Sequence, residues 1–101
     1  MSESAIRMSE SGELLLSGVL DYRTGPNLRK QGQALIKSSN AAALVVDCSA
    51  VEKSSSVGLS LLLCFMRDAQ AAGKALSVRA MPEDMREIAQ VSELTELLAQ
   101  P

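Results

Sequence analysis

The chain has 101 residues, a length that supports one small hydrophobic core, so we expect a single domain over residues 1–101. Ten Lys and Arg against 12 Asp and Glu give a net charge of −2, which disfavours nucleic acid as a partner because that partner selects basic patches. The absence of histidine excludes Ser-His-Asp and Cys-His catalysis and histidine-ligated zinc within the chain.

The N-terminal residues, the apolar segments and the cysteines indicate a cytoplasmic location. Residues 1–10 are polar and lack the apolar stretch of a secretion signal. The runs 41–46 and 61–66 are apolar but far shorter than the roughly 20 residues that cross a membrane, so no direct membrane insertion is expected. Cys48 and Cys64 lie within apolar segments without CxxC spacing, which predicts free, buried thiols.

The first third of the chain predicts a hairpin and a helix. Alternation around Ile6 and Met8 favours a short strand, and a turn over residues 10–13 leads into a second strand over 14–20. Pro26 suits the first position of a helix. The inner face of that helix repeats at helical spacing and comprises Leu28, Gly32, Leu35 and Ile36.

The middle of the chain predicts a buried strand, a loop and a second helix. Residues 43–48 form a continuous apolar run typical of a strand covered on both faces. A polar loop is expected over 49–57, followed by a helix over 58–72 that ends before Gly73. On this helix, one side carries Leu62, Phe65, Met66 and Ala69.

The last third predicts a strand over 75–80, a helix that begins at Pro82 and a further helical turn over 92–98. The resulting order, ββαβαβα, predicts an α/β fold with a mixed sheet of four to five strands. Three to four helices would lie mainly on one face of this sheet, with parallel pairing between strands that a helix separates.

The second helix places Leu63, Cys64 and Ala71 at or near its polar side. Apolar residues in such positions often mark a partner surface. A wide buried face would also explain them, and the sequence leaves both interpretations open.

The loop before the second helix concentrates hydroxyl groups. Ser54, Ser55 and Ser56 stand between a buried strand and a helix N-terminus, whose free N–H groups favour an acceptor or an anion. Capping of the helix accounts for such serines structurally, at about 1 kcal/mol. A docking or regulatory role at this end of the sheet is the alternative.

Several segments in this order resemble the STAS domain family. They are the opening hairpin with Gly18, the strand end 45–49, the loop and helix start 54–63, Gly73-Lys74, and the tail 81–98. The resemblance implies a STAS-like (SpoIIAA-like) fold. Within the family, residues 61–63 and the tail are most similar to the MlaB group, the cytoplasmic STAS subunits of an ABC transporter that moves phospholipid between the Gram-negative membranes.

The family pattern in the loop places an Asp before a Ser or Thr that sigma-factor regulators have phosphorylated. By this resemblance Ser56 is the possible phosphoacceptor, and Ser55 stands in place of the Asp. The departure counts against kinase-switched regulation, because the acid belongs to the phosphorylation-site pattern. It leaves docking intact, because docking depends on shape and hydroxyl groups.

The resemblance implies a non-catalytic adaptor that binds the ATPase subunit of an ABC transporter, and through it the permease, with ATP held by the partner. The expected contact surface joins the loop hydroxyls to an exposed edge of the second helix. It comprises Ser54, Ser55, Ser56, Val57, Gly58, Leu59 and Leu63.

The alternative function is an anti-sigma factor antagonist switched by phosphorylation of Ser56. An enzyme is the third class, and it is disfavoured because no nucleophile has a visible base and no glycine spacing fits a phosphate-binding loop. No cofactor or metal is expected.

Overall fold

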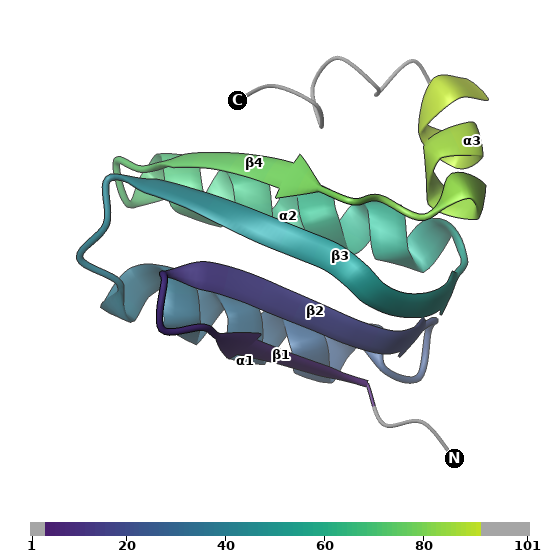
Figure 1. Ribbon diagram of the computed structural model, residues 1–101, viewed down its shortest axis with the longest axis horizontal. Coiled ribbons are helices and arrows are strands. Elements are labelled where there is room, and N and C mark those ends of the chain that lie inside the picture. The colour runs from purple at the N-terminus through teal and green to yellow at the C-terminus, as the bar shows by residue number, and fades with distance from the viewer. Residues whose placement is uncertain (1–3, 92–101) are drawn as a thin grey trace.

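The computed structural model describes residues 4–91, which form a mixed sheet with helices packed on one face (Figure 1). In chain order the elements are β1 (Ala5–Met8), β2 (Glu13–Leu20), α1 (Gly25–Ser38), β3 (Ala43–Ser54), α2 (Ser56–Ala71), β4 (Ala75–Arg79) and α3 (Glu83–Val91). The predicted order ββαβαβα is confirmed. The helical turn expected over 92–98 lies outside the described residues.

The sheet has the strand order β1-β2-β3-β4, with β1 antiparallel to β2 and the other neighbours parallel. Helices α1 and α2 lie side by side behind the sheet in Figure 1, while α3 stands at the end where β3 and β4 finish. Since β2 and β3 run in parallel, their carboxyl ends meet at one edge, and α1 and α2 both start there. No helix in the part of the chain that the structure describes is long and apolar enough to cross a membrane.

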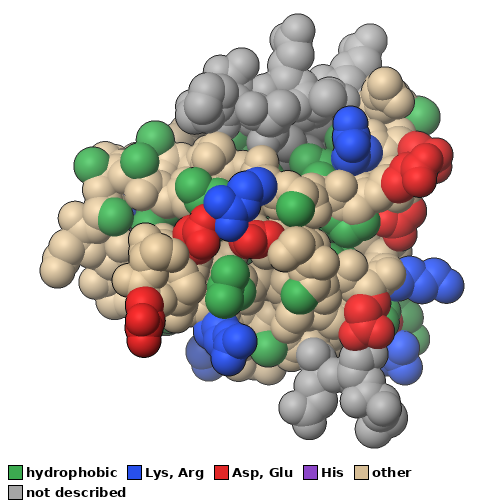
Figure 2. Space-filling model, in the orientation of Figure 1, with side chains coloured by type: hydrophobic (Ala, Val, Ile, Leu, Met, Phe, Trp, Pro, Cys, Tyr) green, Lys and Arg blue, Asp and Glu red, His purple; other side chains and the backbone are tan. Residues whose placement is uncertain are grey.

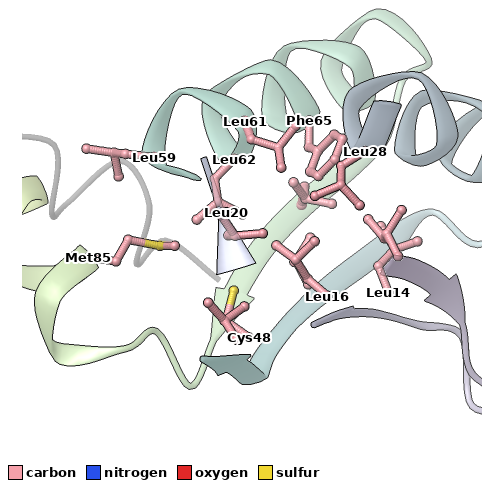
Figure 3. Packing of buried hydrophobic residues seen from close by; sticks show 14 of the residues in the cluster. Leu14, Leu16, Leu20, Leu28, Cys48, Leu59, Leu61, Leu62, Phe65 and Met85 are labelled. Carbon is pink, nitrogen blue, oxygen red and sulfur yellow. The ribbon is translucent and has the colours of Figure 1, made fainter. Parts of the chain in front are cut away.

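The core lies between the sheet and the two long helices (Figure 3). Alternate residues of β2 point towards the helices, so Leu14, Leu16 and Leu20 are fully buried. Phe65 of α2 is also fully buried and packs over Gly32 of α1, where an added Cβ would lie 2.3 Å from the ring. A glycine is therefore required for the close approach of α1 and α2.

Strand β3 is longer than its apolar run predicts. It continues through Ser54 because Ala50, Val51 and Lys53 pair with the second half of β2, with two register shifts along the ladder. The polar loop expected over 49–57 is thus wrong for residues 49–54. Its polar side chains belong to the exposed side of a strand, and α2 begins at Ser56, two residues before the expected start.

No helix of residues 4–91 packs on the other face of the sheet, where an ion-pair cluster crosses the strands. Arg79 of β4 donates to Asp47 Oδ2 at 2.7 Å and also contacts the carboxylate of Glu13. The hydrogen bond from Arg79 lowers the pKa of Asp47 from the ordinary value of 3.8 to about 2. Figure 2 views this open face, where charged side chains are interspersed with apolar ones.

Candidate interaction surface at the start of α2

The junction of β3 and α2 is held by Ser55, the N-cap of α2. Its backbone N–H donates to Leu20 O at 3.0 Å, which ties the junction to the end of β2. Its Oγ accepts a hydrogen bond from the Val57 N–H at 3.2 Å. This bond satisfies one of the free amides of the helix start and contributes about 1 kcal/mol. The capping interpretation of the loop hydroxyls therefore holds for Ser55.

Ser54 does not lie on the rim where the sequence placed it. Its side chain is buried and donates a hydrogen bond from Oγ to Ser55 O at 2.8 Å. Its backbone N–H donates to Asp84 Oδ2 of α3 at 3.1 Å. The expectation of an exposed Ser54 is wrong because β3 extends through this residue and directs it beneath α2.

Gly58 and Leu59 are also buried, so the expected exposed edge of α2 at Leu59 is wrong. An added Cβ on Gly58 would lie 2.0 Å from Ser54 Oγ, which leaves room only for a hydrogen atom. Leu59 is 4% exposed, and α3 packs against α2. Figure 3 shows Met85 of α3 beside this end of α2.

Leu63 and Cys64 are half-buried, and Leu63 packs against the core. The wide buried face thus accounts for Leu63, whereas Ala71 is exposed. Cys48 is a buried free thiol, as expected, and burial raises its pKa to about 12. Cys64 is free but only partly buried.

The residues that remain accessible are Ser55 and Ser56, both exposed, with Val57 half-buried and Ser60 exposed one turn later. Beside them an open hollow of about 310 Å³ lies between the starts of α1 and α2. It is lined chiefly by apolar groups, with one arginine and one serine; they include Pro26, Arg29, Val57, Ser60, Leu61 and Cys64.

The site predicted from the sequence lacks the contribution of α1 to this surface. The available signal was topological: β2 and β3 were expected in one parallel sheet, and Pro26 marked a helix start directly after β2. Helices that follow neighbouring parallel strands start at the same sheet edge. The turn before α1 adds Tyr22, which is 77% exposed with the Arg23 guanidinium over its ring.

The helix starts near this edge differ in their first-turn charges. Neither α1 nor α2 has an acidic residue in its first turn, so their N-terminal partial charges are not offset by acids there. Helix α3 differs, with Glu83 and Asp84 in its first turn. Residues 4–91 contain no group of three Cys, Asp or Glu side chains arranged to hold a metal ion.

Comparison with protein families gives one match, to the model described as "Mlab, STAS domain", over residues 5–99. With this match and the fold described above, the chain belongs to the STAS domain family. Within that family, the matching model is the MlaB one. No curated protein matches the chain significantly.

Solved structures with the same fold include a chain of a transporter complex and anti-sigma factor antagonists. A chain of the Acinetobacter MlaFEDB complex in an ATP-bound conformation is 26% identical, with a TM-score of 0.81 over 93% of this chain and 96% of that one. An anti-sigma factor antagonist from Mycobacterium paratuberculosis is 26% identical, with a TM-score of 0.76 over 95% and 81%.

The anti-sigma factor antagonist SpoIIAA in its unphosphorylated form is 18% identical, with a TM-score of 0.72 over 92% of this chain and 83% of that one. At this identity the likeness shows the fold alone. The SpoIIAA-like architecture expected from the sequence is confirmed.

Proposed function

We propose that this protein is a non-catalytic adaptor subunit that binds the ATPase of an Mla-type ABC transporter and supports its activity in phospholipid transport between membranes. Through the ATPase it would join the permease and maintain outer-membrane lipid asymmetry. It would work in the cytoplasm, peripheral to the inner membrane.

One observation carries the proposal: the match to the MlaFEDB complex extends over nearly the whole of both chains, at a TM-score of 0.81. Agreement over 96% of that chain leaves little of it without a counterpart here. The family model points the same way, because it is the MlaB one and spans residues 5–99. An adaptor needs a surface and no catalytic group, which suits a chain without histidine.

The contact surface that we propose is the exposed part of the α2 start, namely Ser55, Ser56 and Val57. Ser54, Gly58 and Leu59 support it from beneath and do not contact the partner. Leu63 is half-buried and lies at the margin of this surface. Few well-packed residues carry most of the binding energy in such interfaces, so these three residues can form the centre of a larger contact area.

The test compares Ser56→Asp with Ser56→Ala in binding to the purified ATPase subunit of the Mla-type transporter from the same organism. An acid at the first position of α2 favours the helix dipole, so the variant stays folded while a charge enters the interface. We expect Ser56→Asp to weaken binding at least about tenfold and Ser56→Ala by less than about threefold.

A wild-type chain that does not bind the ATPase contradicts the adaptor function. Normal binding by Ser56→Asp would leave the function in place and remove Ser56 from the interface. Circular dichroism and the thermal midpoint of each variant serve as the folding control.

The second candidate is an anti-sigma factor antagonist, favoured by the match to the Mycobacterium paratuberculosis protein at 26% identity. Ser56 is exposed at the first helical position, where an added phosphate would meet the positive end of α2. The test is incubation with a cognate anti-sigma kinase and ATP, followed by mass spectrometry. An unmodified Ser56 counts against this candidate.

A further inference from the structure

The hollow between the starts of α1 and α2 has features that the adaptor function does not by itself require. Its walls are mainly apolar, with Pro26 on one side and Val57 and Leu61 on the other. Its volume of about 310 Å³ is at the low end of the roughly 300–1,000 Å³ of small-molecule sites, and it is open to solvent. An open apolar hollow of this size fits a side chain that another surface presents.

The charged groups around the hollow indicate which kind of partner side chain would bind beside it. Arg29 lines the hollow and is 49% exposed, and within residues 4–91 its ion-pair contact is a long one, 3.9 Å to Asp68 Oδ1. The N-termini of α1 and α2, which have no acidic residue in their first turns, border the same hollow. The acidic residue in the turn before α1, Asp21, already accepts hydrogen bonds from Arg23 and Thr24.

We infer that this hollow receives an apolar side chain of the partner protein, and that a carboxylate next to it on the partner contacts Arg29. The inference rests on the proposed adaptor function and extends the interface from the tip of α2 across to α1. Charge complementarity supports it, because the exposed Arg29 guanidinium and two helix N-termini without first-turn acids lie beside the apolar walls.

The first arm of the test fills the hollow. Ser60 is exposed at its rim, so Ser60→Phe places a ring over the hollow without disturbing the core. Gln70→Phe makes a similar change at another exposed position of α2 and is the matched control. With the purified ATPase subunit, we expect Ser60→Phe to weaken binding at least about tenfold and the control to bind within about twofold of wild type.

The second arm removes or reverses the charge. Arg29→Gln and Arg29→Glu should weaken binding and reduce its dependence on NaCl concentration, because the ion pair with the partner carboxylate is lost. Lys30→Glu makes the same reversal at the exposed neighbouring residue, which does not line the hollow. It should retain the salt dependence of wild type.

The third arm needs no substitution. Cys64 lines the hollow and is partly buried, whereas Cys48 is fully inside the core. Iodoacetamide followed by mass spectrometry should therefore report on Cys64, and saturating ATPase subunit should slow its alkylation. The thermal midpoints of all variants are measured first, so that unfolding is not counted as lost binding.

The outcomes separate the two claims. Weaker binding by Ser60→Phe and the Arg29 variants, with protection of Cys64, supports the inference. If wild type binds but these variants match their controls, or Cys64 is alkylated at the same rate in the complex, the inference is overturned and the adaptor function stands. If wild type does not bind the ATPase subunit, both are overturned.

Discussion

Ser55 performs the same structural task that an aspartate would perform before the first residue of α2. Aspartate and serine are comparably good N-caps, and the Ser55 hydroxyl accepts from the Val57 amide as a carboxylate would. The change from the family pattern therefore keeps the helix start and removes one negative charge. That removal makes the edge more positive, which agrees with a partner that brings its own carboxylate.

The contact between Gly58 and Ser54 leads to a prediction about stability. Gly58→Ala places a methyl group about where Ser54 Oγ lies, at a distance of 2.0 Å. Although alanine favours a helix by about 1 kcal/mol over glycine, we expect a net loss of about 1–3 kcal/mol from the overpacking.

Urea unfolding of the double variant Gly58→Ala/Ser54→Ala gives the matched comparison. Removal of the hydroxyl should restore part of the lost stability, with a coupling free energy of at least about 0.5 kcal/mol. Additive effects of the two substitutions would show that this close approach does not limit residue 58.

Asp47 predicts how stability changes with acid. Its pKa is lowered to about 2 in the folded protein, so its ionised form stabilises the fold above the ordinary pKa of 3.8. This contribution is lost as the pH falls from about 4 towards 2.

Urea unfolding at several pH values tests this dependence. Asp47→Asn should be less stable than wild type at pH 6 and should approach wild type as the pH nears 2. Glu52→Gln, at an exposed position of the same strand, is the control and should keep the acid dependence that arises from Asp47. A parallel pair of curves for wild type and Asp47→Asn would contradict the assignment.

At the scale of elements, α3 is attached to the β3–α2 junction through one carboxylate. Asp84 Oδ2 accepts from the Ser54 N–H at 3.1 Å, and Oδ1 accepts from the Met85 N–H at 2.8 Å. One side chain thus holds the end of β3 and the start of α3 together, 30 residues apart in sequence. The position of the exposed serines therefore depends on α3 as well as on β2.

Substitution of Asp84 tests this attachment. Asp84→Ala should lower the free energy of unfolding by about 1–3 kcal/mol, because a buried amide loses a charged acceptor. Hydrogen exchange at the Ser54 amide should become faster. Glu83→Ala removes an exposed acid from the same turn and should cost only the dipole contribution, about 0.5 kcal/mol.

The sequence predicts the elements better than it predicts which loop residues are exposed. The order of strands and helices follows from local patterns, such as alternation in β2 and Pro26 at the start of α1. Which of these residues are buried depends on non-local packing, such as the pairing of β3 with β2 and the contact of α3 with α2. No local pattern carries that information.

The candidate site shows the same limit. Ser55 and Ser56 were placed correctly as hydroxyls at a helix start, because capping chemistry is local. The hollow beside them combines residues of α1 with residues of α2, and only the sheet topology brings these together. The α1 side of the surface was for that reason absent from the predicted site.

At the scale of the whole molecule, the two faces of the sheet are unlike. The two long helices cover one face (Figure 1), and charged side chains lie on the other (Figure 2). There Glu13 and Asp47 form ion pairs with Arg79. The proposed contact surface lies at the carboxyl ends of β2 and β3, at one edge of the molecule. Binding of the ATPase should therefore be insensitive to changes in the middle of the open face.

Ser77→Lys tests this expectation. Ser77 pairs with Val45 on the open face, in the same row as Glu13. The variant adds a charge without touching α1 or α2, so affinity for the ATPase subunit should stay within about twofold of wild type, in contrast to the hot-spot losses at Ser56. A large loss measured by the same titration would move the interface to the sheet.

Only Ser55 separates the last residue of β3 from the first of α2, and its own amide is bonded to β2. The connection between β3 and α2 is therefore a single residue with no loop. Binding of another protein at Ser56 should therefore also affect the stability of the central strands β2 and β3, because no loop separates them from the start of α2. We expect such binding to slow hydrogen exchange of the buried amides in the central strands and to raise the melting temperature of this protein.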